Sequence, residues 1–138
     1  MREVRHGPAR LLVADDNKVN RLLLARRLEL QGHAVAMAGN GRVALEMLRR
    51  ERFDLLLLDM EMPEMNGFEV LAHLRQSGSL AQVPFIFLTA SADRDSIARG
   101  IALGAADYVT KPFDLTQLAA LVRRRLGETG HGFPPARE

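Results

Sequence analysis

Polar side chains that could take part in chemistry follow four separate apolar runs of this sequence. They are Asp15 and Asp16, Asp59, Thr89, and Lys111. A carboxylate can act as a nucleophile, a hydroxyl can donate a hydrogen bond, and an ammonium can neutralise the oxygens of a phosphoryl group. Brought to one place, this set is suited to phosphoryl transfer. Taken singly, each has a plainer explanation, since Asp59 could simply end a strand and Thr89 could cap a following helix.

The apolar runs predict the strands that would position these groups. Five are expected, over residues 10–14, 35–38, 55–58, 83–88 and 106–109. The four consecutive leucines of residues 55–58 suit a strand that is buried on both faces of a parallel sheet. Helical periodicity predicts five helices, over residues 17–31, 40–52, the segment with the stripe Phe68, Val70, Leu71 and Leu74, 96–103 and 115–126.

The alternation of strands and helices predicts right-handed βαβ units and an α/β fold. The fold class expected is doubly wound and flavodoxin-like, a five-stranded parallel sheet in the order 2-1-3-4-5 with five helices. We expect residues 10–126 to form the domain, residues 1–9 to be a flexible lead, and residues 127–138 to be a flexible tail or linker. The stripe expected to face the core in the second helix is Val43, Ala44, Met47 and Leu48.

This fold would bring the polar groups together, because the carboxyl ends of parallel strands lie at one edge of a sheet. Three carboxylates crowded there would repel one another and raise their pKa values. Two cations would relieve the repulsion, the ammonium of Lys111 and a bound divalent metal. Oxygen ligands with partial access to solvent favour Mg2+ over softer metals.

Composition narrows the classes of function. The 138 residues are 47% hydrophobic and contain no cysteine, which excludes a disulfide framework and a thiolate metal site. No run approaches transmembrane length and the N-terminus lacks an apolar signal-peptide core, so we expect a cytoplasmic protein without a membrane partner. The net charge is +2, and the arginine clusters fall on expected surface helices among acids. With one tyrosine and no tryptophan, direct nucleic-acid binding is not expected.

The complete set of motifs resembles the receiver domain of two-component response regulators, the chemotaxis-regulator-like family, over residues 10–126. The set is an acid pair after the first strand, the Asp59 strand followed by Met-Pro-x-Met-x-Gly, a threonine after the fourth strand, and Lys111-Pro112. The resemblance implies a phosphoacceptor signalling domain rather than an enzyme. Its expected phosphodonor is a histidine kinase or a histidine phosphotransfer protein, and its expected cofactor is Mg2+.

The resemblance also implies a role for each residue of the site. Asp59 would accept the phosphoryl group. Asp16 and Asp59 would bind Mg2+ directly with the backbone carbonyl of Glu61, and Asp15 would act through a metal-bound water. Lys111 would pair with Asp59 or with its phosphoryl oxygens. The side chain of Glu61 would tune dephosphorylation, in a direction that the sequence leaves open.

A second group of residues is implied to carry the signal outward. Thr89 would hydrogen-bond the phosphoryl group and move toward it, and Tyr108 would be an aromatic switch. The surface of residues 96–126 would change, so that an effector domain or a second copy of the chain binds it. The small Ala90 would leave room for a phosphodonor, and the Lys111-Pro112 bond is expected to be cis.

The first helix is apolar on more than one side. Leu24 and Leu28 share one face. Other apolar residues, interleaved with Arg26, spread over the opposite side: Val19, Leu22, Leu23 and Leu30. This second face, and in particular Val19, Leu22, Leu23 and Arg26, is a candidate docking site for a partner helix. Scattered surface leucines are the alternative.

Three other functions compete with a stand-alone receiver. A phosphatase of the haloacid dehalogenase type also uses an aspartate nucleophile at a strand end, but it expects a second aspartate two residues later, where this chain has Glu61. A degenerate receiver could act as a constitutive interaction domain, although the acid pair, Thr89 and Lys111 are intact. The start Asp-Asp-Asn with Asn20 and Arg21 is also typical of receivers within hybrid kinases or multidomain regulators.

Overall fold

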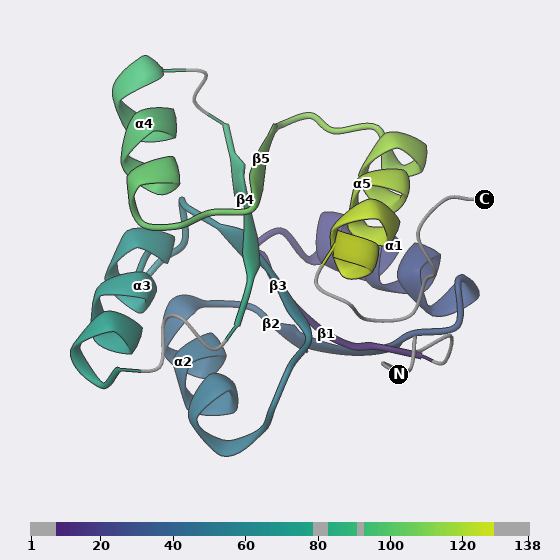
Figure 1. The fold of residues 1–138 in the computed structure, drawn as a ribbon, viewed down its shortest axis with the longest axis horizontal. Coiled ribbons are helices and arrows are strands. Elements are labelled where there is room, and N and C mark those ends of the chain that lie inside the picture. The colour runs from purple at the N-terminus through teal and green to yellow at the C-terminus, as the bar shows by residue number, and fades with distance from the viewer. Residues whose placement is uncertain (1–7, 79–82, 91–92, 129–138) are drawn as a thin grey trace.

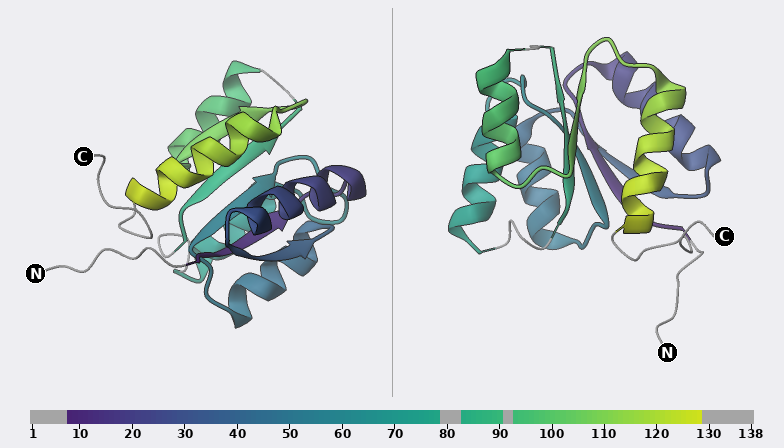
Figure 2. Two further views of the ribbon diagram at one scale, coloured as in Figure 1. Left: turned by 90° about the vertical axis from the view of Figure 1, so that its right-hand side faces the viewer. Right: turned by 45° about the horizontal axis from the view of Figure 1, so that its top comes forward.

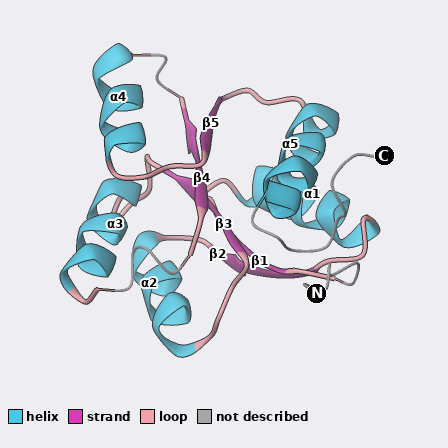
Figure 3. Ribbon diagram, viewed as in Figure 1, coloured by secondary structure: helices cyan, strands magenta, loops and turns pink. Residues whose placement is uncertain are grey.

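The computed structural model describes residues 8–78, 83–90 and 93–128. Within these residues the chain forms five strands and five helices, which Figures 1 and 3 show. The strands are β1 (Arg10–Ala14), β2 (Ala34–Ala38), β3 (Leu55–Asp59), β4 (Phe85–Thr89) and β5 (Asp107–Thr110). The helices are α1 (Lys18–Leu30), α2 (Gly41–Arg50), α3 (Gly67–Gln76), α4 (Arg94–Ala102) and α5 (Leu115–Glu128).

The strands form one parallel sheet in the order β2-β1-β3-β4-β5, which confirms the predicted fold class. Helices α1 and α5 cover one face of the sheet, and α2, α3 and α4 cover the other (Figures 1 and 2). Helices on both faces bury a parallel sheet on both sides. The central strand β3 is therefore buried at every position.

Alternate residues of the central strands fill two apolar clusters, one on each face of the sheet. Leu55 and Leu57 belong to the cluster under α1 and α5, whereas Leu56 and Leu58 belong to the cluster under α2 and α3. This division follows from the two-residue period of a strand. The unbroken leucine run thus supplies both cores and delivers Asp59 to the carboxyl end of the sheet.

Asparagine caps begin three of the helices that follow these strands. The side chains of Asn17, Asn40 and Asn66 accept hydrogen bonds from backbone N–H groups in the first turns of α1, α2 and α3. The cap of α3 is a complete capping box, because Glu69 also accepts from the N–H of Asn66. These caps fix where each loop at the carboxyl edge of the sheet turns into a helix.

The structure corrects the predicted inner face of α2 at Val43 and confirms it at Ala44. Its buried residues are Gly41, Ala44 and Leu45, and Val43 is 37% exposed. Met47 and Leu48 are only partly buried against the core. The helix begins at Gly41, whose backbone packs closely on the β3–α3 loop, and Ala44 and Leu45, three and four residues later, lie on the same inner face.

Two domain boundaries differ by a few residues from those expected. Ala9, placed in the N-terminal lead, is fully buried, and its carbonyl accepts a hydrogen bond from the N–H of Ala34. Helix α5 continues to Glu128, beyond the expected end at residue 126. The rest of the expected lead and tail, residues 1–7 and 129–138, lies outside the described residues.

Among the helices that the structure describes, none has the length and apolar character that a membrane crossing requires.

Candidate functional site

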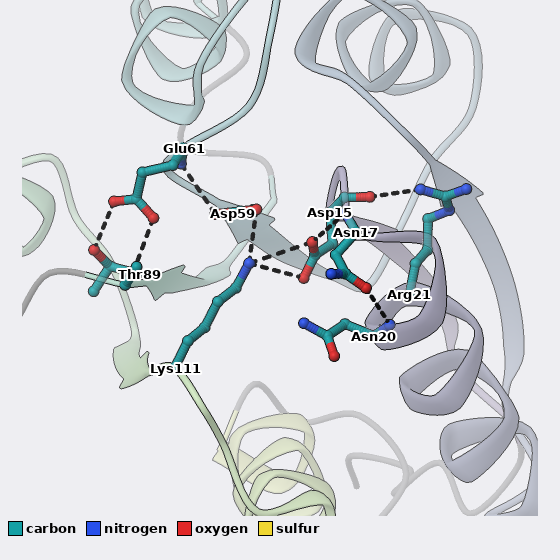
Figure 4. A network of polar contacts seen from close by, with 9 residues as sticks. Asp15, Asn17, Asn20, Arg21, Asp59, Glu61, Thr89 and Lys111 are labelled. Atoms are coloured by element: carbon teal, nitrogen blue, oxygen red, sulfur yellow. Dashed lines mark hydrogen bonds and ion pairs between the residues drawn. The ribbon is translucent and has the colours of Figure 1, made fainter.

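The carboxyl ends of β1, β3, β4 and β5 bring the predicted acids, hydroxyl and lysine to one edge of the sheet (Figure 4). Asp15, Asp59 and Thr89 are completely buried, whereas Asp16 is exposed. Asp59 lies opposite Leu88 in the β3–β4 register, one residue before Thr89. The loop after β3 is held close by Gly67, since a Cβ at that position would lie 2.6 Å from the carbonyl oxygen of Asp59.

Lys111 joins the two buried aspartates. Its Nζ lies 2.9 Å from Oδ2 of Asp59, 3.2 Å from Oδ2 of Asp15 and 3.3 Å from Oδ1 of Asp15. Burial alone would lower the pKa of Lys111, but the two carboxylates raise it above its ordinary value, so the ammonium stays charged. Lys111 also begins the turn after β5 that contains the cis bond to Pro112, as predicted.

The pKa of Asp59 moves in the opposite sense to that of a typical salt-bridged carboxylate. Burial raises it from 3.8 to about 7, and the charge of Asp15 adds to this effect. Hydrogen bonds from Lys111 and from the N–H of Glu61 lower it only in part. The carboxylate of Asp59 therefore lacks sufficient positive charge around it, which is the condition that a bound cation would correct.

The three aspartates form a group that could hold such a cation. Oxygen atoms of Asp15, Asp16 and Asp59 all lie within 4.8 Å of one another. Oδ2 of Asp15 is buried and accepts no hydrogen bond, although the ammonium of Lys111 lies nearby. An all-carboxylate site of this kind, open at Asp16 and closed at the other two acids, fits a hard divalent ion that keeps part of its water shell.

One contact that shapes the β1–α1 loop was not predicted from the sequence. Nη1 of Arg21 donates a hydrogen bond of 2.8 Å to the carbonyl oxygen of Asp15. The N–H of Asn17 donates to Oδ1 of Asp15 at 2.9 Å. Together they fix both the backbone and the carboxylate of Asp15. The position of Arg21, one helical turn after the Asn17 cap, is the signal that could have indicated this contact.

Glu61 makes three hydrogen bonds across the site, of which the sequence indicated none in detail. Its N–H donates to Oδ1 of Asp59 at 3.0 Å. Its carboxylate accepts from the hydroxyl of Thr89 at 2.9 Å and from the N–H of Ala90 at 2.9 Å. In Figure 4 the side chain points toward Thr89 and away from Lys111. Glu61 thus connects the β3–α3 loop to the end of β4.

Tyr108 lies on β5, at the position opposite Phe87 of β4. The two rings stack with their centroids 5.8 Å apart and their planes at 27°. Tyr108 nevertheless remains 38% exposed. The aromatic residue proposed as a switch is therefore in contact with the core strand that ends in Thr89, and it borders solvent.

The candidate docking face lies on the outer side of α1 and is exposed. Leu24 and Leu28 of α1 are fully buried against the sheet, as predicted. On the outer side, Val19, Leu22 and Leu23 are 64%, 45% and 51% exposed. Arg26 is exposed as well. Because α1 begins directly after the Asp15–Asp16 pair, this face adjoins the acidic edge of the sheet.

Comparison with known proteins identifies relatives of the whole domain. Residues 11–123 match the response regulator receiver domain family. The response regulator MprA of Mycolicibacterium vanbaalenii is 40% identical over 125 residues, which cover 88% of this chain and 52% of that protein. This chain thus spans about half the length of the curated relatives that it matches.

Two solved structures are similar over nearly the full domain. The receiver domain of the Francisella response regulator 1452 has a TM-score of 0.81 at 29% identity, and the match covers 88% of this chain and 98% of that one. The receiver domain of a signal transduction histidine kinase from Syntrophus aciditrophicus has a TM-score of 0.78 at 31% identity, with 94% and 95% covered. The present chain, with buried Asp59 and Thr89 and the adjoining Lys111 on a 2-1-3-4-5 sheet, belongs to the response regulator receiver domain family of two-component signalling.

Proposed function

We propose that Asp59 accepts a phosphoryl group from a phosphohistidine of a histidine kinase or a histidine phosphotransfer protein. An oxygen of the Asp59 carboxylate attacks phosphorus, the bond between phosphorus and the imidazole nitrogen breaks, and the histidine leaves. The observation that carries the proposal is the position of Lys111, whose Nζ lies 2.9 Å from Asp59 within a group of three aspartates. This ammonium can neutralise charge on the phosphoryl oxygens during transfer.

Mg2+ is the cofactor proposed for this step. Asp16 and Asp59 would hold it with the backbone carbonyl of Glu61, and Asp15 would contribute through a metal-bound water. When bound, the ion would neutralise carboxylate and phosphoryl oxygens. The protein's own contribution is to hold Asp59 in place, through Lys111 on one carboxylate oxygen and the N–H of Glu61 on the other.

We further propose that phosphorylation changes the surface formed by α4, β5 and α5. The hydroxyl of Thr89 would turn toward the phosphoryl oxygens, and Tyr108 would move inward beside β4. The contact between Tyr108 and Phe87 supports this route, because the two rings already couple β5 to the strand that ends in Thr89. The change would shift an equilibrium between two conformations rather than create a new one.

The output of the altered surface is an effector domain or a second copy of the chain. The domain would act in the cytoplasm, as expected from its composition. The second candidate is a receiver within a hybrid kinase. The similarity to the receiver domain of the Syntrophus histidine kinase supports this candidate. Sequencing the gene on both sides of the region that encodes this chain would decide between the two.

The proposal is tested by incubating the protein with acetyl phosphate and Mg2+ and measuring its intact mass. We expect one added phosphoryl group on the wild type, none on Asp59→Asn, and one on the control Asp114→Asn, whose asparagine can still cap α5. Labelling of Asp59→Asn would contradict the assignment of the phosphoacceptor. Steady turnover of a generic phosphomonoester would instead favour the phosphatase alternative.

A further inference from the structure

We propose that the carboxylate of Glu61 occupies the phosphoryl-binding donors in the resting protein, and that a phosphoryl group on Asp59 must displace it. The two bonds from Thr89 and Ala90 to Glu61 are called the Glu61 clasp below. The inference rests on the proposed function, since it concerns how the same site is held before phosphorylation. It assigns to the Glu61 side chain a role distinct from that of its backbone carbonyl.

The clasp uses both oxygens of Glu61 on two adjacent donors. Oε2 accepts from the hydroxyl of Thr89 and Oε1 accepts from the N–H of Ala90, each at 2.9 Å. A carboxylate that bridges two neighbouring donors resembles two oxygens of a phosphoryl group in shape and in charge. Glu61 is tied to the acceptor residue itself, because its N–H binds Oδ1 of Asp59.

The Glu61 clasp and a phosphoryl group exclude each other because they need the same two donor protons. A hydroxyl and a backbone amide each carry a single proton to donate. While Thr89 and Ala90 donate to Glu61, neither proton is available for a phosphoryl oxygen. The donors can serve the two acceptors only in turn, and Thr89 is completely buried at the strand end, with its hydroxyl donating to Glu61 in the geometry observed.

Charge acts in the same direction. Asp15, Asp16 and Asp59 form one acidic group, and the ammonium of Lys111 pairs with Asp15 and Asp59, whereas the carboxylate of Glu61 lies on Thr89 and Ala90. A phosphoryl group would add further negative charge beside Glu61. Because Glu61 lies on an exposed loop, its side chain can turn out to solvent at small cost, and the repulsion would drive it there.

The direct test is a crystal structure of the wild type with Mg2+ and beryllofluoride, an analogue of the phosphoryl group. We expect the carboxylate of Glu61 to have left both donors and Thr89 and Ala90 to bind fluorine. A complex in which Glu61 still accepts from both groups would overturn the proposal. This test needs no variant and so does not depend on the folding of one.

A titration of three variants with beryllofluoride at fixed Mg2+, followed by NMR, supplies the energetic test. Glu61→Ala removes the clasp but keeps the backbone carbonyl, Glu61→Gln keeps its length without its charge, and Glu64→Gln removes a charge from the same loop without touching Thr89. We expect Glu61→Ala to reach half-saturation at a beryllofluoride concentration about tenfold lower than the wild type requires. A difference of this size corresponds to the loss of about one charge-assisted hydrogen bond. Glu61→Gln should fall between the two.

The remaining outcomes are equally decisive. Without beryllofluoride, the amide proton of Ala90 should shift in Glu61→Ala and stay in place in Glu64→Gln. Equal affinity of Glu61→Ala and wild type would overturn the clasp, and so would an equal gain in Glu64→Gln, which would reveal a general effect of charge. Failure of the wild type to bind beryllofluoride at all would overturn the proposed function itself. This outcome is distinguishable from the others because no variant would then bind beryllofluoride either.

Discussion

Lys111 holds Asp59 and Asp15 at once, with Nζ 2.9 Å from one carboxylate and 3.2 Å from the other, and both carboxylates are fully buried. Lys111→Met would leave two buried acids without their cation. We expect the free energy of unfolding to fall by about 3–5 kcal/mol at pH 8, the range typical of removing one partner of a buried ion pair. Urea denaturation without Mg2+ measures this change.

The other lysine of the chain supplies the control for that experiment. Lys18 is exposed at the start of α1, so Lys18→Met should change stability by less than about 0.5 kcal/mol. Adding Mg2+ should restore part of the stability lost in Lys111→Met, since the metal would replace the missing positive charge. If both substitutions have the same small effect, the ion pairs of Lys111 contribute little to the fold.

Asp59 should make stability depend on pH in the direction opposite to an ordinary salt-bridged carboxylate. Its pKa rises from 3.8 to about 7, so between these values the folded protein holds a proton that the unfolded chain has released. Stability conferred by this proton is present at low pH and is lost as the pH rises through about 7. In buffer free of Mg2+, Asp59→Asn should therefore stabilise the protein by about 1–3 kcal/mol at pH 8 and by much less at pH 4. Equal stabilisation at both pH values would contradict the shift.

The two aspartates after β1 should differ in their effect on metal binding. Asp16 is exposed and makes the open side of the acid group, whereas Asp15 is buried and already bound by Lys111 and Asn17. Calorimetric titration with Mg2+ should show binding abolished in Asp16→Ala and weakened in Asp15→Ala. Unchanged binding in Asp16→Ala would show that the ligands are assigned wrongly.

The exposed face of α1 should matter for a protein phosphodonor and not for a small one. Leu23→Asp should slow transfer from a phosphohistidine protein and leave labelling by acetyl phosphate unchanged, because only the protein must dock. Leu30→Asp is the matched control, since Leu30 is even more exposed, at 75%, but lies at the far end of the helix. Equal slowing with both donors would indicate a folding defect, and equal effects of both substitutions would remove the docking role.

Gly41 should tolerate no side chain. A Cβ there would lie 1.9 Å from the carbonyl oxygen of Met65, whereas one at Gly39 would meet only the flexible side chain of Arg21, at 3.2 Å from Nη1. We expect Gly41→Ala to lower the free energy of unfolding by about 2 kcal/mol or more, and Gly39→Ala by well under about 1 kcal/mol. Thermal unfolding of the pair makes the comparison, and similar values would show that the β3–α3 loop yields easily.

The strand ends were predictable because they depend on a simple rule. A short unbroken apolar run, such as that of residues 55–58, favours a strand buried on both faces, and parallel strands place their carboxyl ends together. Asp15, Asp59, Thr89 and Lys111 follow from these two facts alone. The two sides of α1 were equally readable, since Leu24 and Leu28 are buried while Leu22 and Leu23 are exposed.

What escaped prediction depends on backbone geometry within loops. The reach of Glu61 to Thr89 requires a β3–α3 loop that turns sharply at Glu64, where φ is 68°, and packs against Asp59 through Gly67. No spacing rule encodes that path. Val43 was wrongly assigned to the inner face of α2, whereas Ala44 was assigned correctly; the face that packs inward also carries Gly41, whose close backbone contact with Met65 no hydrophobic pattern indicates.

Gly100 lets the backbone of helix α4 pack directly against strand β4. Within α4, described in full from Arg94 to Ala102, it is the one buried residue, and a Cβ there would lie 2.3 Å from the ring of Phe87. Helices usually lock together because side chains of one fit between those of the other. Here the backbone of the helix packs directly against an aromatic ring instead. Any side chain at position 100 would therefore have to displace Phe87, the ring that also stacks on Tyr108, so a single added methyl group would disturb α4 and β5 together.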